Sequence, residues 1–390
     1  MATKKNSGSG SSEESVSPKA KPTPRAKAGT SKTATSKTAT SKTTTSKTAS
    51  GKTAGAGAAG SKQARAGGSG PRTYTELSVS SFQHPADRAA TAALTAIPGL
   101  DTVVRWLIEQ GYERALYQQN LAASVRIGPS QLPSVHESFV SVLTVLDLPG
   151  AFEKPPVLYV GQNPELNAMT IGSQNPYVVL TSRLVEVLDA NELRAVMGHE
   201  VGHIMASHVL YHTALQILLG ISVPLLSPGT LPLTAVRLAL LEWFRAAELT
   251  CDRAAVLAVD DPELVCRTLM VLGAGLPSSQ LSLPSFMDQV RDYQEWDDGP
   301  DRLRRFLSLL NQTHGTPVRR ASEIMRWVDS GEFDRIRSGD YVRLGNEADV
   351  GKATGEAVAH YGERFRDIAS AAGESVSKVS NKLQSWLQSD

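Results

Sequence analysis

The 390-residue chain has only two cysteines, Cys251 and Cys266, which are too few to form a disulfide framework. This scarcity is typical of a protein from a reducing compartment. No apolar run reaches the 18 or so residues that a membrane-spanning helix needs. The first residues, MATKKNSGSGSSEES, also lack the apolar segment of a signal peptide. We therefore predict a cytoplasmic protein without a membrane span, and we leave peripheral contact with a membrane open.

Residues 1–72 lack the large apolar side chains that build a hydrophobic core, since Val16 is the only one after Met1. This segment holds 14 basic and 2 acidic residues, a net charge of about +12, and it repeats a TSKTA unit. The rest of the chain holds 26 basic and 37 acidic residues, so the net charge of +1 conceals a basic tail and an acidic body. We predict that the tail is disordered.

Two interpretations of this tail stay open. It can be a solvated linker, or it can be an arm whose lysines bind nucleic acid or another anionic surface. Because no aromatic residues lie between the lysines, base stacking is excluded, and any such contact would be weak and independent of base sequence.

Helical periodicity dominates the folded body, which we place at residues 73–340. Asp189, followed by Glu192, forms a strong N-terminal cap, so a long helix should run from about residue 190 to beyond residue 208. Other apolar patterns predict helices at 89–124, broken at Pro98-Gly99, and at 132–146, strands at 156–160 and 178–181, and an edge strand at 167–172.

Residues 341–390 form a separate amphipathic helical segment, with apolar residues at seven-residue spacing from Phe365 to Trp386. Such a helix can lie on the body, pair with another chain or contact a membrane surface. Its polar face mixes lysine with acidic residues, which disfavours the membrane. The pattern leaves the oligomeric state open.

The segment Met197–Met205 contains a His-Glu-x-x-His pattern on the predicted long helix. His199 and His203 lie one turn apart on the same face, so both rings can bind one zinc ion. Glu200 lies beside that ion, where it can take a proton from a zinc-bound water. The pattern is specific, and the alternative is a buried helix with two hydrogen-bonded histidines.

A catalytic zinc ion needs a third protein ligand and an open position for water. His208 follows His203 by five residues, about 500° of helical rotation, and should point away. The metzincin pattern is also absent, since Ala206 and Val209 occupy its glycine and histidine positions. We therefore interpret His208 and His212 as structural.

Glu248 and Asp252 share one face of a second predicted helix and lie beside apolar residues, so both carboxylates should be buried. Buried carboxylates need partners, and a metal ion is one. Glu248 could bind the zinc ion while Asp252 accepts a hydrogen bond from a ligand histidine. Spacing alone leaves the alternative that Arg245 pairs with Glu248 at the surface.

These motifs resemble the gluzincin metallopeptidases that include CAAX prenyl proteases and HtpX-like proteases, from about Phe82 to Trp327. The resemblance implies an α+β, mainly helical, zincin-like fold with a small sheet packed on the active-site helix. It also implies one Zn2+ per chain, with Glu248 as third ligand, and a substrate that adds as a β-strand at the Asn167–Thr170 edge. The family pattern is met by His199, Glu200, His203, Glu248 and Asp252.

Two positions depart from the family pattern. Cys251 stands where the family has alanine, and its thiol could be a fourth ligand or a core residue. His314 approximates a downstream His-Pro pair that is followed by an arginine, here Arg319 or Arg320. It could donate to the oxyanion of the tetrahedral intermediate or lie at the surface.

Membrane members of the family carry spanning helices where this chain has 214–226 and 231–244, which are too short or too charged to span. We predict a buried or interfacial hairpin there, with a shallow dip into a membrane surface as the alternative.

The predicted function is a zinc metalloendopeptidase acting on proteins or peptides, with protein quality control as its setting. The rivals are an inactive or latent zinc-binding scaffold and a nucleic-acid-associated protein. The segment 89–124 could also cover the cleft.

Overall fold

The computed structural model describes residues 72–97, 99–109, 111–148, 154–173, 175–220, 231–296 and 314–346. The predicted basic tail before Arg72 and the predicted amphipathic helix after residue 346 lie outside the described residues. So does the middle of the predicted hairpin, residues 221–230.

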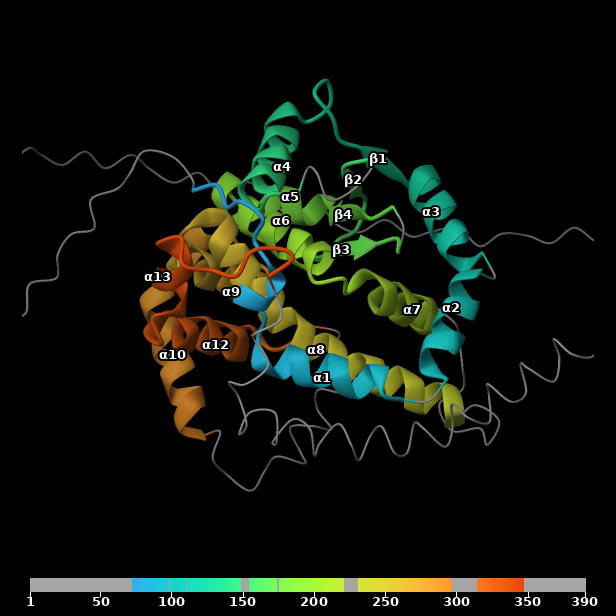
Figure 1. Ribbon diagram of the computed structural model, residues 1–390. Coiled ribbons are helices and arrows are strands. Elements are labelled where there is room, and N and C mark those ends of the chain that lie inside the picture. Colours follow the sequence, from blue (N-terminus) through green and yellow to red (C-terminus); the bar gives the residue numbers. More distant parts are fainter. Residues whose placement is uncertain are drawn as a thin grey trace, which may run out of the picture. The chain divides into compact units, whose positions relative to one another are not determined.

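Helices form most of the described body, around one small sheet (Figure 1). The helices are α1 (Pro85–Thr95), α2 (Leu100–Glu109), α3 (Tyr112–Ala123), α4 (Pro133–Val145), α5 (Ser182–Val187), α6 (Ala190–Met205), α7 (Val209–Gly220), α8 (Leu231–Val259), α9 (Pro262–Ala274), α10 (Leu283–Trp296), α12 (Pro317–Asp329) and α13 (Glu332–Arg337), with short 3-10 turns at Val79–Ser81 and Ser278–Gln280. The strands are β1 (Ser124–Arg126), β2 (Val157–Gly161), β3 (Ala168–Ile171) and β4 (Tyr177–Thr181).

The described sheet has the strand order β1-β2-β4-β3, with β2 and β4 parallel and the two outer pairs antiparallel. One face carries Leu158, Val178 and Leu180 into the main core, and on the other Tyr159 and Tyr177 meet edge to face. The prediction of an edge strand at 167–172 is confirmed, because β3 occupies the end of the order. This edge lies beside α6 and α7.

Two hydrophobic cores meet along α8. The main core joins α4, one sheet face, α6, α9, α12 and α13 to the C-terminal half of α8. The second core joins α1, α2 and α7 to the N-terminal half of α8. Glu248 and Asp252 therefore lie where one long helix passes from one core to the other, and both are buried.

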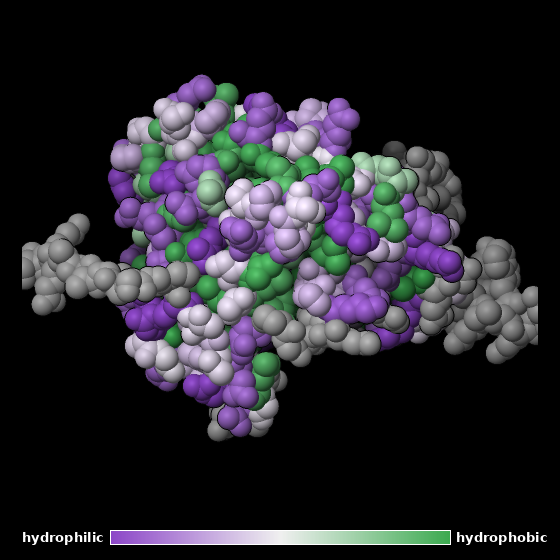
Figure 2. All heavy atoms as spheres, turned by 90° about the horizontal axis from the view of Figure 1, so that it is seen from above, coloured by the Kyte–Doolittle hydropathy of each residue, from purple (hydrophilic) through white to green (hydrophobic). Residues whose placement is uncertain are grey.

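The mainly helical α+β fold class is confirmed, and so is the helical character of 89–124, which forms three helices. The predicted helix beyond His208 is wrong, because α6 ends at Met205 and α7 begins at Val209. Residues 341–346 also belong with the body, since Ser78 N donates to Val342 O and Leu344 N to Glu76 O. No described helix has the length and apolarity to cross a membrane. On the face seen in Figure 2, apolar residues lie among polar ones.

Candidate active site

Helix α6 carries the histidine motif and starts at the predicted cap. Asp189 Oδ1 accepts from the backbone N of Asn191 and Glu192, and Glu192 Oε2 accepts from Asp189 N at 3.0 Å. This reciprocal capping box satisfies N–H groups that a helix start otherwise leaves unpaired. The first turn is thereby fixed, and with it the direction in which α6 crosses the core.

Two glycines let α6 approach α8 closely. A Cβ at Gly198 would lie 2.6 Å from Ala258 Cβ, and one at Gly202 would lie 2.8 Å from Ala254 Cβ. Both distances are too short for real atoms, so any side chain here would force the helices apart. Because each glycine adjoins a histidine of the motif, this contact sets the distance between the histidines and α8.

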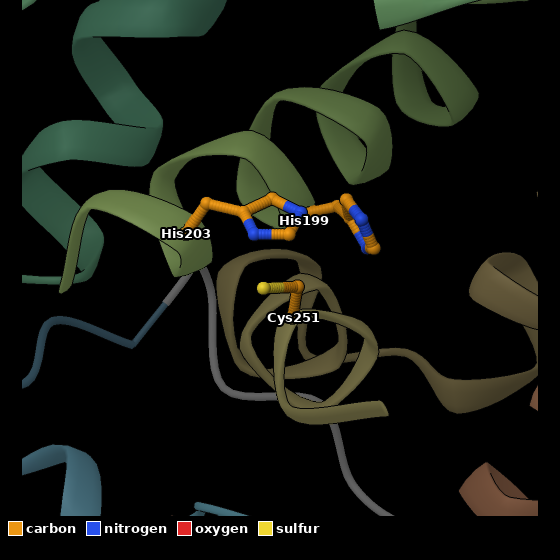
Figure 3. Close-up of side chains that lie close together, drawn as sticks. All are labelled: His199, His203 and Cys251. Carbon is orange, nitrogen blue, oxygen red and sulfur yellow. The ribbon is translucent and has the colours of Figure 1, made fainter. Parts of the chain in front are cut away.

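His199 and His203 project from α6 toward α8 (Figure 3). The Nε2 atoms of His199 and His203 lie 3.5 Å and 3.3 Å from the same oxygen, Glu248 Oε1. Two ligands about 2.0–2.1 Å from a tetrahedral ion are roughly 3.3 Å apart, so both separations suit a shared metal. Glu248 Oε1 is buried and accepts no hydrogen bond. Burying an unpaired carboxylate oxygen costs free energy unless a cation binds it. Two imidazoles and a carboxylate also match a catalytic donor set, so these residues fit a metal ion.

The second carboxylate oxygen of Glu248 is held by the protein. His314 Nδ1 lies 2.9 Å and Arg320 NH1 lies 3.1 Å from Glu248 Oε2. Although burial opposes the shift, the contacts with His314 and Arg320 hold the pKa of Glu248 well below its usual value. Glu248 is therefore an ionised carboxylate with one fixed oxygen and one oxygen facing the two histidines.

Asp252 lies within hydrogen-bond distance of His199 and is itself held by Arg320. His199 Nδ1 lies 3.1 Å from Asp252 Oδ1, and Arg320 donates to Asp252 from Nε at 2.8 Å and from NH2 at 2.5 Å. Burial opposes the charge of His199, but Glu248 and then Asp252 raise its pKa to about 9. Burial lowers the pKa of His203 to about 3. A hydrogen bond from His199 Nδ1–H to Asp252 leaves Nε2 directed at Glu248.

Glu200 faces the same cavity and has a fixed orientation. Thr170 Oγ1, on strand β3, donates to Glu200 Oε2 at 2.7 Å. Both residues are buried. The hydroxyl leaves the carboxylate able to accept a proton while limiting its rotation. Sequence reasoning missed Thr170, because its partner is 30 residues away and a lone threonine in a short strand carries no signal.

Two other predicted positions, Cys251 and Arg245, have definite places. Cys251 lies on the side of α8 that faces α6 (Figure 3). Its Sγ and one ring nitrogen each of His199 and His203 lie within 4.8 Å of one another, so the thiol is near enough to share a metal ion with them. Its Sγ also lies 3.7 Å from His208 Nδ1, and burial raises the pKa of its thiol well above the usual value. This favours the neutral core thiol. Arg245 donates to Glu242 at 2.7 Å, whereas Glu248 is buried with Oε2 on His314 and Arg320, so Glu248 is not part of a surface pair.

A cavity of about 390 Å³ lies beside His199 and His314. Its polar wall includes His199, Glu200, Asp252, His314 and Arg320. Its apolar wall comes mainly from α6, α9 and the segment before β3, with Leu166, Val196, Val265, Leu269 and Leu272. None of its lining residues comes from 89–124, so that segment does not line the cleft.

The outer edge of β3 faces this cavity at one residue, Ala168. Thr181 N donates to Asn167 O at 3.0 Å, so the antiparallel alternation turns the N–H and C=O of Ala168 away from β4. Further along, Thr170 O accepts from His212 Nδ1 at 2.9 Å, and Gly172 N donates to Thr213 Oγ1. Helix α7 therefore covers the edge beyond Ala168, so only the first part of the predicted Asn167–Thr170 substrate edge is left uncovered.

Comparison with known proteins agrees with this geometry. Residues 129–328 match peptidase family M48. The chain belongs to peptidase family M48. It is 34% identical over 271 residues to the plastoglobule-localized metallopeptidase 48, chloroplastic, of Arabidopsis thaliana, covering 68% of this chain and 77% of that protein.

A second M48 resemblance is local. The chain is 47% identical over 51 residues to a protease HtpX homolog of Streptococcus pneumoniae, which covers 13% of this chain and 17% of that protein. No solved structure matches the chain. Membership of M48 establishes a metal-dependent peptide hydrolase. It also confirms the predicted gluzincin resemblance.

Proposed function

We propose that this M48 protein is a zinc-dependent metalloendopeptidase that cleaves protein substrates. The observation that carries the proposal is the unpaired, buried Glu248 Oε1, which lies within 3.5 Å of both His199 and His203 Nε2. Zinc suits two imidazoles and one carboxylate better than calcium or magnesium, which prefer oxygen ligands.

The residues around the cavity support a hydrolytic mechanism. Bound zinc would supply a Lewis acid that polarises the scissile carbonyl and lowers the pKa of water. Glu200, held by Thr170, takes a proton from the attacking water and passes it to the leaving amine. His314 lines the cavity while its Nδ1 binds Glu248, so it is our candidate donor to the developing oxyanion.

Substrate would bind as an extended strand at the β3 edge, through the backbone of Ala168. Such pairing uses backbone groups in the middle of a chain and does not need a free terminus, which supports endopeptidase cleavage. The apolar wall of the cavity favours an apolar side chain near the scissile bond. Because an extended strand requires a locally unfolded substrate, we also propose a role in protein quality control. Cleavage of an unfolded protein, with its folded form left intact, is the expected result.

The first experiment measures bound metal by mass spectrometry in wild type, Glu248→Ala and Glu200→Gln, beside casein cleavage with and without a chelator. We expect about one zinc per wild-type chain, loss of zinc in Glu248→Ala, and retained zinc without cleavage in Glu200→Gln. Zinc in the wild type without any cleavage would indicate the latent scaffold instead. A wild type that binds no zinc would contradict the proposed centre.

The cytoplasmic location and the weak nucleic-acid contact of the basic tail stay predictions. For the tail, we expect binding to DNA that weakens steeply as salt is added. Affinity that is unchanged by salt would contradict an electrostatic arm.

A further inference from the structure

The corner between α6 and α7 returns His208 to the histidine motif. Helix α6 ends at Met205, and Ser207 has a left-handed φ of 56°, so the regular rotation per residue stops there. His208 N donates to His203 O at 3.0 Å. The His208 ring consequently lies beside His203, with their two Nδ1 atoms 3.3 Å apart. The prediction that His208 points away from the motif is therefore wrong. Its Nδ1 contacts Nδ1 of His203, whereas Glu248 lies at Nε2 on the other side of the His203 ring.

A buried aspartate holds the other side of the His208 ring. Asp87, on α1, lies with its Oδ2 3.2 Å from His208 Nε2. The same oxygen accepts from Thr250 Oγ1 at 2.7 Å and from Gln83 Nε2 at 3.1 Å, and Oδ1 accepts from Thr91. Asp87 is completely buried, and every one of these partners can donate to it.

These contacts determine the direction of each hydrogen bond. A carboxylate only accepts, so His208 must carry its proton on Nε2. With that proton on Nε2, His208 Nδ1 can accept a hydrogen bond, and its neighbour His203 can donate to it from Nδ1. A histidine protonated on Nδ1 keeps its Nε2 lone pair free. That lone pair lies 3.3 Å from Glu248 Oε1. Cys251, whose thiol is a weak donor, lies 3.7 Å from the same His208 acceptor, which agrees with this direction.

We propose that Asp87 and His208 are positioning residues that fix the tautomer and ring orientation of His203 for metal binding. This inference rests on the proposed zinc centre. His203 thereby has its own carboxylate-anchored partner, as His199 has Asp252. Asp87 lies before residue 129, outside the segment that matches family M48, so α1 adds part of the metal centre from beyond that segment.

The test compares two amides at position 208. An asparagine places its oxygen near the position of His Nδ1, so His208→Asn keeps an acceptor for His203. A glutamine places its amide near Nε2, so His208→Gln keeps a partner for Asp87 and loses the acceptor. Zinc affinity is measured by competition with a chelator on the full chain. The visible absorption of the cobalt-loaded protein gives a second readout that does not depend on activity.

We expect His208→Gln to weaken zinc binding by about 10–100-fold and to change the cobalt spectrum. His208→Asn should stay within about three-fold of wild type. Asp87→Ala should weaken zinc in the wild-type background and have no further effect in the His208→Asn background. Gln83→Ala is the matched control, because it removes another donor to Asp87, and it should leave zinc affinity unchanged.

The two substitutions at position 208 are similar in polarity, so a general loss of folding should affect both. Equal losses in His208→Asn and His208→Gln, or no loss in either, would overturn the positioning role while the wild type still binds zinc. Absence of zinc from the wild type would instead overturn the proposed centre together with this inference.

Discussion

At the scale of single residues, the two oxygens of Glu248 have opposite surroundings. Oε2 contacts His314 and Arg320, whereas the buried Oε1 accepts no hydrogen bond. A buried carboxylate with one unpaired oxygen is unfavourable unless a cation completes it. Arg320 also binds Asp252, so a single guanidinium holds both carboxylates. Sequence reasoning found Glu248 and Asp252 by spacing but gave Arg320 no role, because 68 residues separate it from Asp252.

Thr170 offers a test of how Glu200 is oriented. Thr170→Val removes the hydroxyl that donates to Glu200 Oε2 and nearly conserves the volume of the side chain. We expect kcat to fall about 10–100-fold, since a hydrogen bond to a charged group contributes about 1.5–3 kcal/mol, while zinc content stays unchanged. Thr268→Val is the control, because Thr268 lines the same cavity but donates to Leu264 O in its own helix. Equal losses in both variants would contradict the role of Thr170.

The pKa of His199 predicts how stability depends on pH in the absence of metal. Its folded-state pKa of about 9 exceeds the usual 6.5, so its stabilising contribution is complete below pH 6.5 and disappears as pH rises through 9. Chelator-treated protein should therefore lose up to about 3 kcal/mol of unfolding free energy across this window. Denaturant unfolding at several pH values measures the loss. His199→Gln should remove this dependence, and an equal decline in that variant would assign it to other groups.

At the scale of secondary-structure elements, the contact between α6 and α8 determines the site. Small residues on α8 face Gly198 and Gly202, so the helices approach closely at the level of the histidines. The sequence predicted both helices, and the resemblance indicated that they share a metal. Neither the sequence nor the resemblance predicted how closely the two helices approach, because their separation depends on facing side chains that are about 50 residues apart in the chain.

Gly202→Ala should separate these helices. Alanine normally stabilises a helix relative to glycine by about 1 kcal/mol. Here its Cβ would lie 2.8 Å from Ala254 Cβ and 3.0 Å from the backbone of Cys251, so we expect a net destabilisation of about 2 kcal/mol. Zinc affinity should fall as well. Gly128→Ala, at a position with no atom within 4 Å, is the control for both measurements. Unchanged stability and zinc affinity in Gly202→Ala would contradict the close contact.

The end of α6 shows what a sequence pattern cannot reveal. Apolar and polar residues continue with helical spacing from α6 into α7, so the pattern predicted one helix past His208. Ser207 instead adopts a left-handed conformation that is unfavourable for a residue with a side chain. Buried contacts of His208 with Asp87 and His203 compensate for it, and the contact with Asp87 joins residues 121 positions apart in the chain. The edge strand β3 was predictable because its signal is local.

At the scale of the whole described body, the N-terminal helices supply an apolar partner for the α7–α8 pair. Residues of α1 and α2, including Leu94, Leu100 and Val104, bury the N-terminal half of α8 in the second core. Polar contacts continue this interface to the active site, since Trp243 Nε1 donates to Thr91 and His84 N donates to Thr250. The described part of the predicted hairpin is therefore largely buried against protein, and α1 connects that core to the metal centre.

Two truncations separate the tail from this interface. Every residue assigned to the proposed centre lies between Asp87 and Arg320, so removing residues 1–71 should leave zinc content and casein cleavage unchanged. Removing residues 1–99 also deletes α1, which exposes the second core and takes Asp87 away from His208. Zinc affinity and the melting temperature should then both fall. If the longer truncation kept full zinc affinity, α1 would be a covering helix without influence on the metal. If removing residues 1–71 already abolished cleavage, the basic tail would be needed for activity, which would contradict a metal centre confined to residues 87–320.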